Sequence, residues 1–290
     1  MKIKDNRDQQ LKRNEIVPRK LNVNFDKNIP KYWCNNSAFM THMLNTYTLL
    51  VPDNEIYYIR HLNACADDLT DQTLINRLHR FCRQEAQHGM GHKAYWRNLE
   101  ESGINYKGFV GSVGWFNYKL LEPILPRAMH LANIACIEHI NAYLGSFFLE
   151  RDLLENADPK MKLLFYWHFA EEIEHKSVAF DVYQNLYGSY LLRVSGAILV
   201  FPLFYTINTA GTLYLLWQDK RLFKLDTWRD YWGFLFKKGA LLYTLRNILA
   251  YLSPGFSPSH KDDYRLVEEF FADENNSRHF KTFPADQGPT

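Results

Sequence analysis

The chain lacks several features that would assign it quickly to a known class. No C-x-x-C pair is present, and the four cysteines are spread along the 290 residues: Cys34, Cys65, Cys82 and Cys136. Three of them lie in apolar stretches with a helical pattern and are expected to be reduced core residues. An apolar signal segment is also missing, because residues 1–20 are polar and charged. These absences favour a cytoplasmic protein.

A strong charge of either sign is absent as well. Lys and Arg together number 34 and Asp and Glu together 32, which leaves a net charge of +2. Such a balance gives no reason to expect a nucleic-acid partner. Strand signals are scarce, whereas helical periodicity is strong over residues 32–159. With apolar residues at 47%, these observations predict an all-α protein with a sizeable core.

What the chain does contain is a repeated pattern of glutamate and histidine. Two Glu-x-x-His pairs, Glu85/His88 and Glu172/His175, each follow a single upstream glutamate at 30 and 34 residues respectively. Residues three apart share a helix face, so the members of each pair point the same way. One Glu from each of two helices and a Glu-x-x-His from each of two others form the ligand set of a dinuclear site in a four-helix bundle.

This pattern predicts two metal ions held inside the bundle. Mixed Glu and His ligands with open positions suit iron, or alternatively manganese, better than structural zinc, which favours sulfur. Charged residues on solvated helix faces are the alternative explanation. That explanation fits Glu155 but not Glu138, which is surrounded by apolar residues and needs a partner if it is buried. The predicted metal ligands are Glu55, Glu85, His88, Glu138, Glu172 and His175.

Three further histidines lie close to this pattern. His168 lies four residues before Glu172 on the same helix face. It is either a seventh ligand, catalytic together with Glu138 and Glu172, or a residue that supports the ligands without binding metal, or a hydrogen-bonded core histidine. His92 either lines the substrate pocket or reaches the metal. His139 points about 100° away from the neighbouring Glu138, so a structural role is expected for it.

The residues directly before two ligand glutamates are predicted to orient the histidine ligands. In a pseudo-twofold site such a residue accepts the free ring N–H of the histidine on the opposite half. We therefore expect Glu171 to pair with His88 and Gln84 with His175. A surface ion pair is the alternative for Glu171. Glu174 faces away from the ligands and is expected to be exposed or paired with Lys or Arg.

The chain divides into four predicted segments. Residues 1–30 form a basic arm, residues 31–188 the bundle, residues 189–253 an apolar helical hairpin, and residues 254–290 a tail. Residues 194–217 carry no charge, and about 20 apolar residues suffice to span a bilayer. Three alternatives stay open for the hairpin: packing on the bundle or at a homodimer interface, contact with the inner membrane surface, or spanning.

Helix boundaries follow from caps and prolines. Ser37 and Asp53 are both plausible N-caps, and Asp71 or Thr70 caps the second ligand helix. Pro159 suits the first turn of the fourth. The four ligand helices are predicted at residues 52–69, 70–102, 126–156 and 159–187, with a connecting helix at 110–125, a second apolar stretch at 231–252 and a short amphipathic segment at 264–271.

Four stretches of this sequence resemble the bacterial family named predicted metal-dependent hydrolases, over about residues 30–250. They are Tyr32-Trp33, residues 49–55 (LLVPDNE), residues 84–92 (QEAQHGMGH) and residues 171–176 (EEIEHK). In that family Pro-x-Gly-Glu is usual before the first glutamate, and here Asn54 replaces the glycine. The ligand pattern is also similar to ferritin-like di-iron oxygenases, and His168 resembles the extra histidine of the arylamine N-oxygenases among them. A ferritin-like bundle is the fold that this similarity implies.

Three functions compete at this point. A di-iron oxidase or oxygenase would act on an apolar, lipid-like or amine-containing small molecule, and it would need dioxygen and an electron donor. A dinuclear hydrolase would use the same ligands to activate water. Iron storage, or a metal-stabilised membrane-associated scaffold, is the third. The glutamate-rich ligand set favours the oxidase. Aromatic residues expected to wall its pocket are Tyr58, Trp96, Tyr143 and Trp167.

Overall fold

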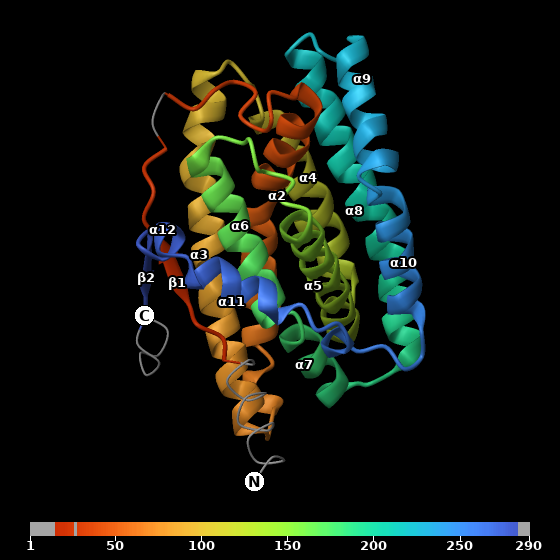
Figure 1. Cartoon of the computed structure of the whole chain (residues 1–290). Coiled ribbons are helices and arrows are strands. Elements are labelled where there is room, and N and C mark those ends of the chain that lie inside the picture. Colours follow the sequence, from red (N-terminus) through yellow and green to blue (C-terminus); the bar gives the residue numbers. More distant parts are fainter. Residues whose placement is uncertain (1–14, 26–27, 284–290) are drawn as a thin grey trace.

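The computed structural model describes residues 15–25 and 28–283, and these residues form a helical bundle with one very small sheet (Figure 1). The all-α prediction is confirmed. The first part of the predicted arm, residues 1–14, and the end of the predicted tail, residues 284–290, lie outside the described residues.

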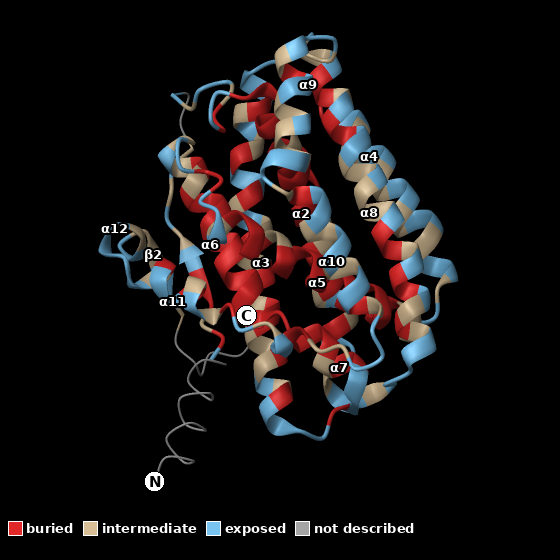
Figure 2. Cartoon of the chain, turned by 45° about the vertical axis from the view of Figure 1, so that its right-hand side comes forward, coloured by how far each residue is buried: buried red, intermediate tan, exposed pale blue. Residues whose placement is uncertain are grey.

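Four long helices form the centre of the molecule. They are α2 (Ala38–Asn63), α3 (Gln72–Glu101), α5 (Arg127–Glu150) and α6 (Pro159–His175). Helix α2 packs along α3, and α5 packs along α6, while weaker contacts join the two pairs. Buried residues concentrate on these helices, as the red segments in Figure 2 show. Each of the four carries one or two of the predicted ligands, so the bundle directs them toward a common interior.

The local sequence explains where these helices begin. Ser37 caps α2 by accepting the N–H of Met40, and Asp71 caps α3. Asp158 caps α6, with Pro159 in its first turn, as predicted. The predicted cap Asp53 and the predicted ligand helix over residues 52–69 are wrong, because α2 runs from Ala38 through Pro52 to Asn63. The helix tolerates this proline because tertiary packing buries the surrounding turns and outweighs the lost hydrogen bond.

Two other predicted boundaries need correction. The last ligand helix does not run to residue 187: α6 ends at His175, and α7 (Val178–Leu186) follows after a break. Lys176 at the break buries its ammonium group against Asp263, an ion pair that a sequence pattern does not reveal. The connecting helix is divided into α4 (Lys107–Gly114), a π-helical segment η2 (Trp115–Leu121) and a 3-10 turn.

The apolar hairpin forms a layer beside the bundle. Helix α8 (Tyr190–Gln218) packs on α5 and α2. The return arm is broken into α9 (Leu225–Trp232), the π-helical segment η4 (Gly233–Lys237) and α10 (Ala240–Leu252). Gly239 interrupts this arm with a positive φ of 78°, a conformation that favours glycine. The layer therefore packs along one face of the bundle (Figure 1).

The outer face of this layer is apolar. Among the described helices, only α8 is long and apolar enough to cross a membrane, and a large part of it is not buried by the protein. Length and composition alone are weak evidence for a membrane helix. Large side chains exposed on the layer include Ile198, Trp217, Trp232, Phe236 and Leu249. Figure 2 shows the exposed and intermediate positions along α8 and α10.

The N- and C-terminal segments meet on the opposite side of the bundle. Strand β1 (Arg19–Leu21) pairs antiparallel with β2 (Phe280–Thr282). Helices α11 (Tyr264–Ala272) and α12 (Glu274–Ser277) precede β2, and α11 packs on α6. The expected amphipathic segment near residues 264–271 is thus a helix. This sheet fixes the backbone of β1 next to α3, which positions Arg19 for the role described below.

Candidate metal centre

The structure brings all six predicted ligands together in the interior of the bundle. Their donor atoms form two groups, within each of which the atoms lie within 4.8 Å of one another. Glu172 of α6 belongs to both groups. The first group is Glu55, His88, His168 and Glu172, and the second is Glu85, Glu138, Glu172 and His175. Every member is buried.

The first group is centred on the ring of His88. Its Nδ1 atom lies 4.0 Å from Glu55 Oε1 and 3.7 Å from Glu172 Oε1. The other ring nitrogen, Nε2, lies 3.0 Å from Glu171 Oε2. A carboxylate only accepts hydrogen bonds, so Nε2 carries the proton. Nδ1 is then unprotonated, faces the site and can bind a metal ion through its lone pair. The predicted Glu171–His88 hydrogen bond is present.

The second group is centred on His175, which uses the opposite ring nitrogen. Nε2 lies 3.0 Å from Glu85 Oε1 and 3.2 Å from both Glu138 Oε2 and Glu172 Oε2. Nδ1 lies 2.9 Å from the amide oxygen of Gln84, which accepts its proton. The predicted Gln84–His175 hydrogen bond is therefore also present. A histidine with one nitrogen held in this way has a fixed ring orientation.

An arginine from the N-terminal segment completes the surroundings of both histidines. Arg19 donates to Glu171 Oε1 and to Glu174 Oε1, both at 3.0 Å. Glu174 in turn accepts the amide N–H of Gln84 at 2.6 Å. Glu174 is thus paired with an arginine, as expected, but it is buried and not exposed. The sequence analysis did not identify Arg19. Two buried carboxylates on α6 indicate that a cation is needed, but they do not indicate which of the 34 lysines and arginines supplies it.

A chain of polar side chains leads from the first group toward α2. His168 Nε2 lies 2.8 Å from Glu172 Oε1, and its Nδ1 lies 2.7 Å from His92 Nε2. The other nitrogen of His92 lies 3.1 Å from the hydroxyl of Thr48. His168 therefore belongs to the candidate ligands, whereas His92 is a member of neither group and hydrogen-bonds to His168. His139 bonds the carbonyl of Asn247 and has the structural role that was expected.

Unpaired polar atoms in this interior are the evidence that a metal fits. The atoms without a hydrogen-bond partner include His88 Nδ1, one oxygen of Glu55 and both oxygens of Glu85 and Glu138. Buried polar atoms are almost always paired, so a cluster of orphans needs an explanation. The four ligand glutamates carry four negative charges when ionised, which two divalent cations would balance. The donor set therefore fits a pair of metal ions.

The pKa values in this cluster show the same shortage of positive charge. Burial, together with Glu172 and Glu138, raises the pKa of Glu55 well above its usual value, and burial raises the pKa of Glu138 to about 7. Burial alone would lower the pKa of His175, but Glu172 and Glu138 raise it to about 10. Burial lowers the pKa of His88 to about 3, so this ring stays neutral and can act as a ligand.

The four aromatic residues expected to wall a pocket have different surroundings. Tyr58 lines a small gap beside Glu55, and the edge of Trp167 packs on His88 with ring centres 5.0 Å apart. Tyr143 lines a separate cavity with Lys176. Trp96 donates to the carbonyl of Thr48 and lines neither space. Only two of the four therefore lie near the ligands, because α5 and α3 turn the other two away.

Comparison with known proteins adds one match. The model of a family described as "Predicted metal-dependent hydrolase" matches residues 17–262. This range includes Arg19, all candidate ligands and the apolar layer. No curated protein and no solved structure matches the chain.

Proposed function

Because this chain belongs to the family described as predicted metal-dependent hydrolases, we propose that it is a hydrolase with two metal ions held by the buried Glu and His cluster. The observation that carries the proposal is the set of buried carboxylate and imidazole atoms without hydrogen-bond partners. Glu55, His88 and His168 would hold one ion, Glu85, Glu138 and His175 the other, and Glu172 would contact both.

Two such ions would lower the pKa of a bound water and stabilise negative charge on the substrate oxygen. Water would add across an ester or amide bond, so that the bond to the leaving group breaks and the leaving group takes a proton. The residues around the ligands have supporting roles. Glu171 and Gln84 orient the two imidazoles, and Arg19 keeps Glu171 available as an acceptor. His92 would accept the Nδ1–H of His168 and so orient this ring, and Thr48 contacts the other nitrogen of His92.

A di-iron oxidase or oxygenase is the second candidate, and a specific observation favours it. All seven ligand side chains, including His168, are at most 2% exposed. A dry, glutamate-rich site admits dioxygen more readily than a polar hydrolysable substrate. Iron in this site would supply the redox chemistry, with two electrons from an external donor. The family description gives this candidate no support.

The apolar layer suggests where the substrate comes from. Large apolar side chains are exposed along α8, α9, η4 and α10, and lysines and arginines such as Lys237 and Arg246 lie among them. An amphipathic surface of this kind suits contact with the membrane interface. We include a peripheral membrane location and a lipid-like substrate in the proposal.

One experiment separates the two candidates. The full chain would be purified without oxygen, loaded with Fe²⁺, Mn²⁺ or Zn²⁺, and its metal content counted. Metal-loaded protein would then receive either oxygenated buffer or a panel of p-nitrophenyl esters. Hydrolysis by the Mn²⁺ or Zn²⁺ form without dioxygen supports the hydrolase. An optical change only on mixing the Fe²⁺ form with dioxygen supports the second candidate.

A matched pair of variants controls for adventitious metal. Glu85→Ala removes a candidate ligand, and Glu155→Ala removes an exposed glutamate outside the site. The first should lose metal and activity together, while the second retains both. Full metal occupancy in Glu85→Ala would contradict the site assignment, whichever reaction the protein performs.

A further inference from the structure

A large cavity lies between part of the apolar layer and the bundle. Its volume is about 500 Å³, within the range of small-molecule sites. Helices α2, α5 and α6 form its inner wall, and α8, α9, η4 and α10 form its outer wall. None of its lining residues carries a charge. Burying a charged group there without a partner would be costly, so the cavity selects an uncharged ligand.

The inner end of this cavity adjoins the candidate metal centre. A gap of about 10 Å³ lies next to it and shares three of its lining residues, Tyr47, Phe204 and Asn208. The gap is also lined by Glu55, a ligand of the first group. This space holds about one water molecule. The lining of the cavity is thus continuous with that of a space lined by the candidate ligand Glu55.

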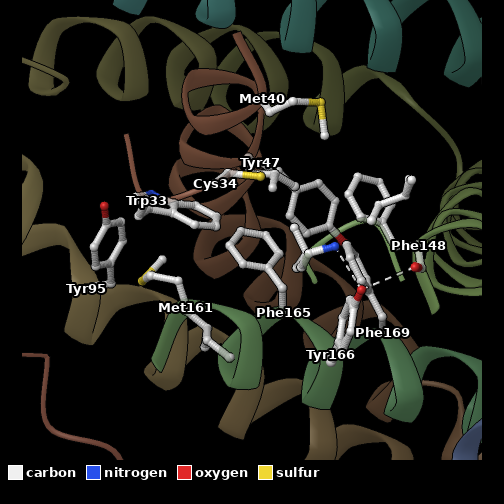
Figure 3. Close-up of a cluster of buried hydrophobic side chains, with 14 of the residues drawn as sticks. Trp33, Cys34, Met40, Tyr47, Tyr95, Phe148, Met161, Phe165, Tyr166 and Phe169 are labelled. Carbon is white, nitrogen blue, oxygen red and sulfur yellow. Dashed lines mark hydrogen bonds between the residues drawn. The ribbon is translucent and has the colours of Figure 1, made fainter. Parts of the chain in front are cut away.

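Tyr47 connects the two spaces. Figure 3 shows its ring beside Phe165 and Phe169, and ring centres of Tyr47 and Phe169 lie 6.0 Å apart. Its hydroxyl lies on the other side, 3.2 Å from Asn141 Oδ1 and 3.4 Å from His168 Nε2. One side chain therefore contributes an apolar wall to the cavity and a polar group beside the ligands.

The outer end of the cavity is apolar as well. Four of its lining residues, Leu213, Trp228, Leu241 and Leu245, are between 36% and 47% exposed. An apolar rim leads from the exposed face of the layer into the cavity. A polar solute gains nothing from this rim, whereas a hydrocarbon chain can leave water gradually as it enters.

We propose that this cavity binds the uncharged hydrocarbon chain of the substrate and places the group to be transformed at Tyr47, Asn208 and Glu55. The placement of the group to be transformed rests on the proposed function, but the binding of the hydrocarbon chain does not. The hydrocarbon chain can come from solution or from a lipid surface, because an uncharged apolar ligand from either source fits the same cavity.

Binding is tested with 1-hexanol, 1-octanol and 1-decanol, which are uncharged chains of increasing length. Each would displace the neutral fluorophore 1-aminoanthracene from the metal-loaded full chain. Affinity should tighten roughly threefold to fourfold per methylene, because each buried CH₂ adds a constant increment. Affinities that do not change with chain length would overturn the proposal.

A pair of tryptophan substitutions locates the site. Thr209→Trp places a large ring on α8 in the cavity, and Leu249→Trp places the same ring on an exposed position of α10 that does not line it. The first should weaken 1-decanol binding at least tenfold, and the second should leave it unchanged. Equal affinity in both would overturn the location. Should Thr209→Trp fail to fold, the chain-length series on the unmodified protein still decides.

Two further arms identify the source and separate the proposals. 1-Decanol supplied in phosphatidylcholine vesicles instead of buffer should also reach the cavity, and faster transfer from vesicles would indicate uptake from a lipid surface. No binding from either source overturns the proposal. Asn208→Phe shortens the end of the cavity next to the gap, so it should weaken 1-decanol binding and lower turnover of p-nitrophenyl decanoate more than that of p-nitrophenyl acetate.

The two possible failures are distinguishable. Chain-length-dependent binding without any ester hydrolysis would contradict the hydrolase and support the cavity site. Ester hydrolysis without chain-length-dependent binding would support the hydrolase and contradict the cavity site. Equal losses for both esters in Asn208→Phe would contradict placement of the reactive group at this end.

Discussion

The two halves of the candidate metal centre are similar in ligands and different in their surroundings. Each half has a histidine from a Glu-x-x-His pair, but His88 faces the site with Nδ1 and His175 with Nε2. The outer partner of His88 is a carboxylate, Glu171, and that of His175 is an amide, Gln84. Only the first half has an additional histidine, His168.

This difference teaches that the repeat in the sequence does not produce equivalent sites. A carboxylate partner gives an imidazole more anionic character than an amide does, so the His88 half should hold its ion more tightly. The His168 ring adds a donor to the same half. One ion is then expected to be bound firmly and the other to be the more exchangeable.

The largest expected effect comes from the residue that both halves share. Glu172→Ala should remove both ions, because Glu172 is the only residue in both ligand groups. Glu55→Ala and Glu85→Ala each affect one half and should leave about one ion per chain. Mass-spectrometric metal analysis of the purified variants measures this. A Glu172→Ala protein that keeps two ions would remove the shared-ligand assignment.

The next effect concerns the residue that joins the outer partners of the two halves. Arg19→Ala should destabilise the fold by about 3–5 kcal/mol, since it leaves Glu171 and Glu174 buried without a cation. Denaturant unfolding would measure it, with Lys20→Ala on the same strand, at an exposed position, as the control. Adding Glu171→Gln to Arg19→Ala should restore part of the lost stability. Equal stability of Arg19→Ala and Lys20→Ala would argue against a buried network.

A smaller effect should reveal the difference between the halves directly. Glu171→Gln makes the partner of His88 an amide, like that of His175. Metal affinity of the first half should fall by about tenfold, because the imidazole loses a charged acceptor. Competitive titration with a chelating dye would resolve the two ions. If the weaker-binding ion is the one affected, the assignment of the tighter half is wrong.

The smallest effect uses a buried carboxylate that already has partners. Asp219 at the end of α8 contacts Lys31, His42 and Tyr32. Burial opposes its ionisation, yet hydrogen bonds from His42, Lys31 and Tyr32 lower its pKa to about 2. A depressed folded-state pKa gives stability that is complete above the unfolded value of about 3.9 and is lost as the pH falls toward 2.

The variant Asp219→Asn should therefore be less stable than the unmodified chain at pH 6 by roughly 1 kcal/mol, with allowance for solvent screening. The difference should shrink as the pH falls from about 4 to 2. Urea unfolding at pH 6, 4 and 3 would follow it. A stability difference that grows in acid would have the wrong sign for this ion pair.

The candidate ligands and their partners could be predicted from the sequence alone. Glu85 and His88 must share a helix face at a spacing of three, and so must Glu172 and His175. The pairings of Gln84 and Glu171 followed from the pseudo-twofold arrangement of the two halves, and both are present. Local periodicity fixes the shared face of each Glu-x-x-His pair, because it depends on residues within one turn of a helix.

Only the tertiary structure decided the rest. Arg19 reaches Glu171 across 152 positions of the chain. The cavity at Tyr47 is closed by α8, α9, η4 and α10, which come after the four central helices in the sequence. Lys176, the residue after the end of α6, pairs with Asp263 across 87 positions of the chain. Contacts of this kind leave no period in the sequence. They arise from which surfaces the folded chain brings together, and packing, unlike helix geometry, is not a local property.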